Sequence, residues 1–330
     1  SGEADPPRDR PGRMVGRREA LVARPDLAGV WDAADALFPV RVTRSWWDRT
    51  DPSDPDDPLA LQVLPDPSEL VEAEGDLDDP VGELARSPVP WVVRKHADRV
   101  LLLVTKRCHL YCRYCFRRTH APGDALDPSP EAWDAALAHA AASGATEAIL
   151  SGGDPLAVRD EVLWDAIARL RAGTIRWVRV HTRAPITAPD RVTAAFARGL
   201  AERGPAWVVV HVNHARELAP DVDAALDRLR AAGLPVLAQT VLLRGVNDDA
   251  DTLAALFEAL VLRGIKPYYL HHPDAVTGNA RFRVGPTEGL GLWEAVRTRV
   301  SGIALPRYVV DPPDGTGKVD VASWLARPGA

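Results

Sequence analysis

Three cysteines in one short run constrain this chain more than any other feature. Cys108, Cys112 and Cys115 have the spacing C-x3-C-x2-C, follow the apolar run 100–104 directly, and are the only cysteines present. Three thiolates on one loop can bind three irons of a [4Fe–4S] cluster and leave the fourth iron open for another ligand. The spacing therefore predicts a cluster with one reactive coordination position.

Two other uses of cysteine fit this pattern less well. A disulfide framework needs an even number of cysteines and an oxidising compartment. A structural zinc site needs four ligands, usually as paired short spacings. His109 and His120 are the nearby candidates for a fourth ligand, and neither stands at a usual offset.

Composition excludes several classes of partner. The 330 residues carry a formal net charge of −6, which gives no basic face for nucleic acid. No apolar run approaches the length that spans a bilayer, so no membrane partner is expected. The chain opens with no pattern of a secretory signal. Together with a cluster-type cysteine run, this favours the reducing cytoplasm.

The first part of the chain differs in amino-acid composition from the rest. Residues 1–97 are rich in Pro, Asp and Arg, and we expect them to form a partly helical N-terminal extension with helices near 17–24 and 28–38. The prolines of residues 51–58 exclude a regular helix there, because proline removes a donor and biases the preceding residue to extended geometry.

A regular alternation follows. Apolar runs that predict strands occur at 100–105, 148–151, 177–182, 207–213, 236–243, 267–271 and 308–311. Stretches with helical periodicity separate them, at 130–144, 160–172, 189–203, 219–233, 249–263 and 286–300. This order predicts an α/β fold with parallel strands, namely a partial (β/α)6-type barrel over residues 98–305 and a C-terminal strand segment over 306–330.

Polar residues follow nearly every predicted strand. They are the cysteine loop, Ser151-Gly-Gly-Asp154, His181-Thr-Arg183, His211-Val-Asn-His214, Gln239 with Thr240, His271-His-Pro-Asp274, and Asp311. The carboxyl ends of parallel barrel strands meet on one rim, where chemistry collects in this class of fold. We therefore expect one site there.

Several of these motifs together resemble a known family. The cysteine spacing is that of radical S-adenosylmethionine (SAM) enzymes. The segments 87–90, 98–105, 211–214, 239–248, 266–270 and 310–318, with Ser151-Gly-Gly-Asp154, resemble lysine 2,3-aminomutases, which are radical SAM enzymes that also use pyridoxal 5′-phosphate (PLP). The resemblance covers roughly residues 45–320 and implies a radical SAM barrel.

The resemblance implies a role for each matching residue. Cys108, Cys112 and Cys115 would bind the [4Fe–4S] cluster. The residues that would hold SAM are Ser151, Gly152, Gly153, Asp154, His211 and Gln239. Lys318 would bind PLP covalently, and Arg99 with Lys95 would bind its phosphate. Arg117 would bind the substrate carboxylate, and Asp274 with Asp311 the distal ammonium of lysine.

The implied reaction is an isomerisation of L-lysine to β-lysine. A 5′-deoxyadenosyl radical would abstract hydrogen and the amino group would migrate. The alternatives that stay open are L-arginine as substrate and a desaturase of a basic amino acid, both with the same cofactors. The resemblance also implies a flavodoxin- or ferredoxin-type electron donor and a homodimer.

Among the departures from the family pattern are two cationic residues. Lys95 stands where a second arginine is usual, so a point charge replaces a planar fork. Arg281 stands where relatives commonly have histidine, and it could neutralise Asp274.

Overall fold

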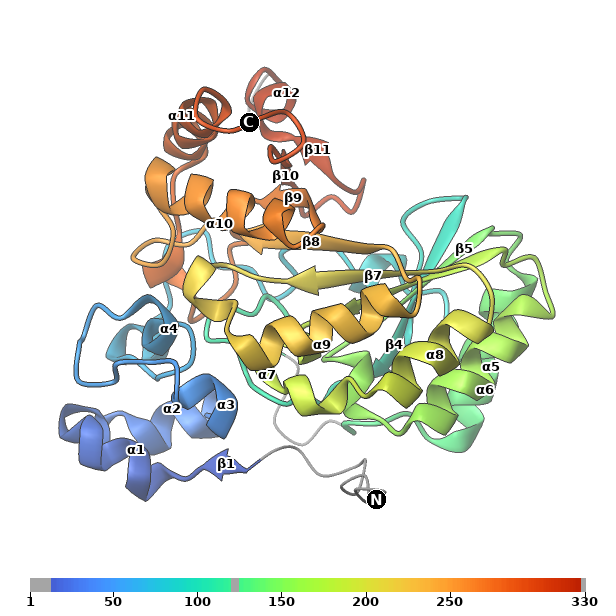
Figure 1. The fold of residues 1–330 in the computed structure, drawn as a ribbon, viewed down its shortest axis with the longest axis horizontal. Helices are drawn as coiled ribbons and strands as arrows, with labels where there is room; N and C mark the ends of the chain where they lie inside the picture. The colour runs from blue at the N-terminus through green and yellow to red at the C-terminus, as the bar shows by residue number, and fades with distance from the viewer. Residues whose placement is uncertain (1–12, 120–124, 328–330) are drawn as a thin grey trace.

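The computed structural model describes residues 13–119 and 125–327. His120 lies outside these ranges. A nine-stranded sheet forms the centre of the molecule, and its strands stand in the order β11-β10-β9-β8-β7-β6-β5-β4-β3 (Figure 1). Neighbouring strands from β4 to β10 are parallel, while β3 and β11 add antiparallel edges. This is the expected partial barrel, open between β3 and β11.

The seven parallel strands agree closely with the predicted ones. They are β4 (Arg99–Thr105), β5 (Glu147–Gly152), β6 (Trp177–Thr182), β7 (Ala206–His211), β8 (Val236–Val241), β9 (Lys266–His271) and β10 (Arg307–Val310). The edge strands are β3 (Val92–Val93) and β11 (Val319–Asp320).

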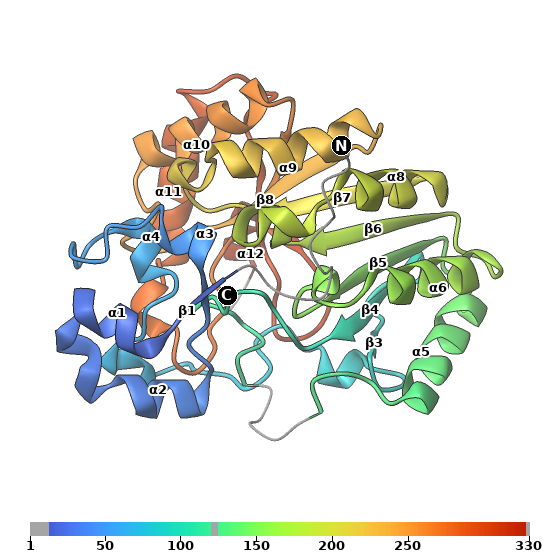
Figure 2. The same cartoon turned by 60° about the horizontal axis from the view of Figure 1, so that its bottom comes forward.

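Helices connect these strands and lie along an arc outside the sheet (Figure 2). The longer ones are α5 (Pro130–Ala142), α6 (Asp160–Arg171), α8 (Ala194–Glu202), α9 (Pro220–Ala231), α10 (Ala250–Leu262) and α11 (Pro286–Arg297). The shorter ones are α7 (Ala184–Thr187), α12 (Val321–Leu325) and the 3-10 turns η4 (Pro155–Ala157), η5 (Pro189–Arg191), η6 (Ala215–Glu217) and η7 (Ala280–Phe282).

The predicted helix 189–203 is divided. Pro189 begins the turn η5, and α8 begins only after Thr193, whose side chain accepts a hydrogen bond from the backbone N–H of Phe196. A side-chain cap of this kind satisfies a donor that the helix leaves free and fixes where the helix starts.

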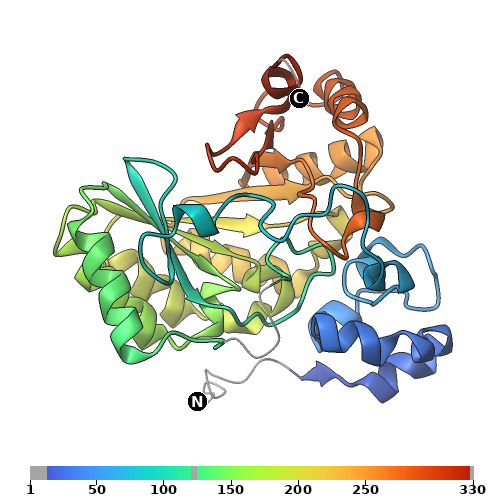
Figure 3. The ribbon, with the colours of Figure 1, turned by 180° about the vertical axis from the view of Figure 1, so that it is seen from behind.

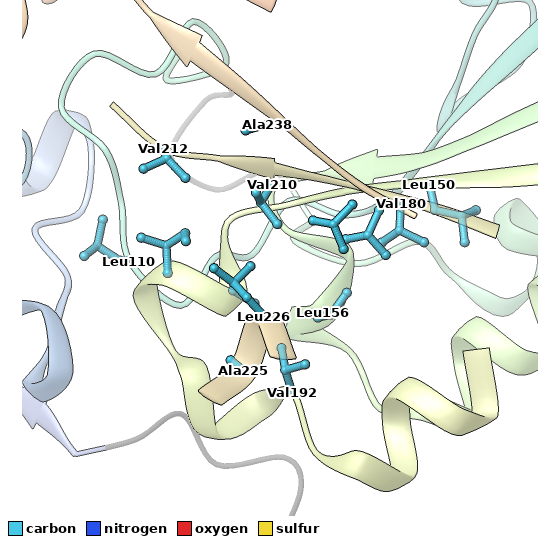
Figure 4. Packing of buried hydrophobic residues seen from close by; sticks show 14 of the residues in the cluster. Leu110, Leu150, Leu156, Val180, Val192, Val210, Val212, Ala225, Leu226 and Ala238 are labelled. Carbon is cyan, nitrogen blue, oxygen red and sulfur yellow. The ribbon is translucent and has the colours of Figure 1, made fainter. Parts of the chain in front are cut away.

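The two faces of each strand have different partners. In β6, Val178, Val180 and Thr182 are buried, whereas Trp177 and His181 alternate with them and line the inner hollow. Figure 4 shows the outer layer, in which Val180, Val210 and Ala238 of the strands pack near Val192 and Leu226 of the surrounding segments. The sheet therefore buries an apolar face against helices and leaves its other face, with polar residues such as His181, around the hollow.

Much of the N-terminal segment lies beyond the carboxyl end of β7 (Figure 1). It contains β1 (Met14–Val15), α1 (Arg17–Ala23), η1 (Pro25–Gly29), α2 (Trp31–Leu37), β2 (Val42–Thr43), α3 (Arg44–Trp47), α4 (Pro58–Leu61), η2 (Pro67–Leu70) and η3 (Leu84–Arg86). Figure 3 shows from behind that its blue part lies on the side away from β4 and β5, whereas the later part, with η3, returns to β4 through β3. Trp46 is fully buried in the main core, so the segment packs firmly on the barrel.

Within the described ranges, the helices lack the combination of length and apolar sequence that a bilayer crossing requires.

Candidate active site

A cavity of about 1120 Å³ occupies the hollow of the sheet. All the residues to which the sequence assigns a site role line it: Lys95, Arg99, Cys108, Cys112, Cys115, Arg117, Ser151, Gly152, Gly153, Asp154, His211, Gln239, Asp274, Asp311 and Lys318. Lys95 precedes β4 and Arg99 is its first residue, whereas the others come from the loop after β4, from β5, β7 and β8 and the residues after β5, and from the segments that follow β9 and β10. One cavity therefore brings together segments more than two hundred residues apart.

The cysteine loop is fixed by its own neighbours. Leu110 between the cysteines is buried and joins the core layer of Figure 4. The backbone N–H of Arg113 donates to the carbonyl of Gln62 at 2.8 Å, which ties the loop to the N-terminal segment. Cys108, Cys112 and Cys115 are free thiols that are partly exposed to the cavity. Burial raises the pKa of the Cys115 thiol to about 11.

These residues fit a [4Fe–4S] cluster. Three free thiols on one anchored loop face one cavity, which is the donor set that such a cluster uses. No three or more His, Cys, Asp or Glu side chains of the described residues are grouped to hold a single metal ion. A cubane does not need such a group, because its thiolates bind different irons.

The glycine pair after β5 has a clear local reason. A Cβ on Gly152 would lie 2.2 Å from the carbonyl oxygen of Thr105, and one on Gly153 would lie 2.3 Å from that of Arg107. Gly152 also has a φ of 134°, which suits glycine. The pair therefore lets the start of the cysteine loop run against the end of β5.

Asp154 completes this junction. Its carboxylate accepts hydrogen bonds from the backbone N–H of Leu156 (2.9 Å), the hydroxyl of Thr182 (2.7 Å) and the backbone N–H of Arg183 (2.8 Å). The Asp154 side chain thus fixes the end of β6 relative to β5.

Arg183, whose backbone N–H is held by Asp154 at the end of β6, contacts the cysteine loop. Its Nη1 donates to Cys112 Sγ at 2.8 Å and to the Tyr114 hydroxyl at 2.5 Å. The Tyr114 hydroxyl also lies 3.0 Å from His211 Nε2. Burial, followed by the charge of Arg183, lowers the pKa of His211 well below its usual value. The His211 ring is therefore neutral at physiological pH.

Arg117 is held by a carboxylate of the N-terminal segment. Its Nε and Nη2 donate to the two oxygens of Glu83 at 2.9 and 2.6 Å, and its Nη1 donates to the carbonyl of Gly152 at 2.8 Å. Burial opposes the charged guanidinium, but Glu83 outweighs this effect and raises the pKa of Arg117. A bidentate pair fixes both the position and the plane of the guanidinium.

Two lysines meet at Asp311. Lys95 Nζ lies 3.0 Å from one carboxylate oxygen and Lys318 Nζ lies 3.3 Å from the other. Burial alone would raise the pKa of Asp311, but the two ammonium groups lower it. Lys95 Nζ also donates to the carbonyl of Val81, so the N-terminal segment reaches this end of the cavity as well.

Asp274 lies near Asp311 in the cavity, but its pKa is shifted in the opposite direction. Burial first, and then the charge of Asp311, raises the pKa of its carboxyl to about 7. Arg281 does not neutralise it. Arg281 Nη2 instead donates to the carbonyls of Leu61 and Leu64, both at 2.9 Å. The cavity therefore contains a buried carboxyl group whose ionised form a bound cation would stabilise.

The residues around Lys318 fit PLP. Lys318 lies in a loop with positive φ at Gly315 and Gly317, where the chain turns sharply. A Cβ on Gly317 would meet the His96 ring at 2.5 Å, so this loop packs against the segment that carries Lys95 and Arg99. An amine and two cationic side chains at one end of a cavity suit an aldehyde cofactor that carries a phosphate.

Sequence patterns assign no role to four residues that the structure places in or beside the site, namely Glu83, Tyr114, Arg183 and Glu217. Glu83 and Glu217 bind Arg117 and Arg183 across 34 positions each, and Tyr114 binds both Arg183 and Asn213. Arg183 is one of the predicted strand-end residues, which was the available signal for it. The partners carry no local pattern, because only the tertiary fold brings them near.

Comparison with known proteins places this geometry in a family. Residues 102–257 match the model of the radical SAM superfamily. The chain is 39% identical over 274 residues to L-lysine 2,3-aminomutase of Clostridium subterminale, covering 82% of this chain and 66% of that protein. It is 42% identical over 281 residues to L-lysine 2,3-aminomutase of Escherichia coli, covering 83% of this chain and 81% of that protein.

A solved structure of a radical SAM methyltransferase from Sphaerobacter thermophilus aligns with a TM-score of 0.45 at 19% identity, over 66% of this chain and 68% of that one. The chain spans slightly less than two thirds of the Clostridium relative and about four fifths of the Escherichia relative. On the extent and identity of these matches, the chain belongs to the L-lysine 2,3-aminomutase family of radical SAM proteins.

Proposed function

We propose that the chain converts L-lysine to β-lysine by moving the α-amino group to the neighbouring carbon. The observation that carries this proposal is that the cysteine loop and Lys318, Asp311 and Asp274 line one cavity. When bound, the cluster with SAM supplies the power to remove a hydrogen atom, and PLP supplies a conjugated system through which an amino group migrates. The residues of the chain position the substrate between them.

Arg117 is our candidate for the substrate carboxylate. Four hydrogen bonds occupy its guanidinium: two to Glu83, one to the carbonyl of Gly152 and a longer one of 3.4 Å to the hydroxyl of Ser151. A guanidinium has five N–H donors, so one is left for an incoming carboxylate. Because Glu83 fixes the plane of the group, that donor has a defined direction.

Asp274 is our candidate for the distal ammonium. Asp311 already has two lysine partners, whereas no hydrogen bond to the Asp274 carboxylate is found among the described residues. A substrate ammonium beside Asp274 would offset the burial that raises the pKa of this carboxyl. The cavity thus has an anion-binding group and a cation-binding group for the two ends of one basic amino acid.

Lys318 is our candidate for the covalent PLP attachment, with Arg99 and Lys95 toward the phosphate. Lys95 stands beside Asp311 in the structure, and the Asp311 carboxylate therefore restrains it. Ser151, Gly152, Gly153, His211 and Gln239 are the candidates for holding SAM. Asp154 contributes by fixing the junction of β5 and β6.

The test is turnover by anaerobically reconstituted protein with SAM, PLP and one amino acid at a time. The proposal predicts β-lysine from L-lysine, weaker turnover of L-arginine, and no product from L-glutamate. Equal turnover of L-glutamate and L-lysine would contradict the role of Asp274. A product two mass units lighter than lysine would show a desaturase instead.

The remaining partners are also proposals. We expect a flavodoxin- or ferredoxin-type donor that delivers one electron to the cluster, a homodimer, and a cytoplasmic location, on the resemblance to the family and on the free thiols of the cysteine loop. Light scattering of the purified protein at micromolar concentration tests the dimer, and a monomeric mass would contradict it.

A further inference from the structure

Arg183 lies against the cysteine loop within a buried polar network. Its Nη1 donates to Cys112 Sγ and to the Tyr114 hydroxyl, and its Nη2 donates to Gln62 Oε1 at 2.8 Å and to Glu217 Oε2 at 3.0 Å. The guanidinium also stands over the Trp46 ring, 4.6 Å from its centre. Four partners and a ring face leave this side chain little freedom to move.

The network keeps a positive charge in a dry environment. The side chain of Arg183 is 9% exposed and that of Glu217 is 0% exposed. Glu217 is itself fixed by Gln62 Nε2 at 3.1 Å and by the backbone N–H of Asn213 at 3.1 Å. Charges interact more strongly in such surroundings than in water. The electrostatic potential at Cys112 therefore depends on both the positive charge of Arg183 and the negative charge of Glu217.

We propose that Arg183 and Glu217 set the reduction potential of the [4Fe–4S] cluster, with Arg183 acting on the thiolate of Cys112 and Glu217 partly offsetting its charge. The proposal rests on the proposed function, because it requires the cluster. It gives Arg183 the role of a positioning residue that holds charge and a hydrogen bond at a cluster ligand.

The sign of the effect follows from electrostatics. The cluster accepts one electron from an external donor and becomes more negative. A hydrogen bond to a ligand sulfur and a nearby positive charge stabilise the reduced state more than the oxidised one. Arg183 therefore raises the potential and makes the cluster easier to reduce. Glu217 has the opposite effect, because its carboxylate is negative.

The experiment is a redox titration of the reconstituted full-length protein, followed by the EPR signal of the reduced cluster, without SAM or substrate. Arg183→Gln should lower the ratio of reduced to oxidised cluster about tenfold at the wild-type midpoint, which corresponds to a shift of about 59 mV for one electron. Arg183→Lys should shift it less, because it keeps the charge. Glu217→Gln should move the ratio in the opposite direction.

A matched control separates this effect from general loss of a charge. Arg263 pairs with Asp223 through Nε at 2.6 Å, at the end of α10, and its other hydrogen bonds go to the carbonyls of Ala259 and Leu218. Arg263→Gln should leave the midpoint at the wild-type value. Melting temperatures of all variants show how far each substitution loosens the fold.

The outcomes are distinguishable. Wild-type protein that fails to bind about four irons per chain overturns the proposed function itself. Wild-type protein with four irons, together with unchanged midpoints in Arg183→Gln and Glu217→Gln, overturns only the inference and leaves Arg183 a structural role. If Arg183→Gln does not retain iron, the test rests on Glu217→Gln. An unchanged or lowered midpoint potential in Glu217→Gln then contradicts the proposal.

Discussion

At the scale of single residues, the cavity mostly holds its charges in pairs. Arg117 pairs with Glu83, Arg183 with Glu217, and Lys95 with Asp311. Asp274 is held differently, since its carboxyl has a pKa raised to about 7 by burial and by Asp311. Because this carboxyl group titrates near neutral pH, its attraction for the substrate ammonium, and with it substrate binding, should depend on pH.

The first prediction concerns that sensitivity. Below pH 7 the Asp274 carboxyl is protonated and neutral, and it attracts an ammonium weakly. The affinity for L-lysine should therefore rise as pH increases through about 7, with a slope of about tenfold per pH unit on the acid side. Equilibrium binding of L-lysine to the PLP-loaded protein between pH 5.5 and 8.5 measures it.

L-norleucine is the matched control ligand, because it has the six-carbon chain of lysine without the ammonium. Its affinity should show no such rise, and Asp274→Asn should flatten the profile for L-lysine. A lysine profile that keeps its slope in Asp274→Asn would assign the titration to another group.

At the scale of elements, the site depends on how closely the cysteine loop approaches β5. Gly153 is the sharpest example, because a Cβ there would lie 2.3 Å from the Arg107 carbonyl oxygen and 2.6 Å from the carbonyl carbon of Lys106. These are backbone atoms, which cannot turn away as a side chain does.

Gly153→Ala should therefore displace the start of the cysteine loop, destabilise the fold by about 1–3 kcal/mol, and lower the iron content after reconstitution. Urea unfolding and iron analysis measure the two effects. Gly291→Ala is the control, since Gly291 stands on α11 with nothing within 4 Å of the added carbon. That change should be neutral or stabilise by about 1 kcal/mol, and equal losses in both variants would refute the steric reason.

A second element-scale prediction concerns the tie between the N-terminal segment and the cysteine loop. Glu69 of η2 is fully buried and accepts from Arg113 and Arg118, which stand on either side of Cys115 in the sequence. Glu69→Ala leaves two buried cations without this partner, so it should destabilise by about 3–5 kcal/mol, measured by urea unfolding.

The exposed pair of Arg244 and Glu288 gives the comparison for that variant. Glu288→Ala should cost at most about 1 kcal/mol. A comparable loss in the two variants would mean that the buried tie adds no special stability.

Much of the fold and part of the site could be predicted from sequence. The strands and the cysteine loop carry local patterns, namely apolar runs and a fixed spacing, and the structure places them as expected. Glu83, Gln62 and Glu217 carry none, because they act across 34 to 121 positions in the chain. The sequence also treats the Gly152–Gly153 pair as a ligand cradle, whereas the close approach of residues 105–107 already requires both glycines.

At the scale of the whole molecule, an open barrel is a suitable frame for this cavity. Its outward side chains bury against helices, while its inward side chains line a large hollow that contains the charged residues of the site. The N-terminal segment supplies Glu83 and Lys95 to that hollow and Gln62 to the network behind it. The segment is therefore part of the site, and the account requires the barrel and the segment together.

The most direct test of the central claim follows the amino group itself. Reconstituted protein with SAM, PLP and a one-electron reductant is given L-lysine labelled with 15N at the α-amino group, and the product is analysed by NMR. The account predicts β-lysine with the 15N bound to carbon 3 and none released as ammonia. Protein that binds four irons and PLP but yields no β-lysine, or loses the label to solvent, would contradict it.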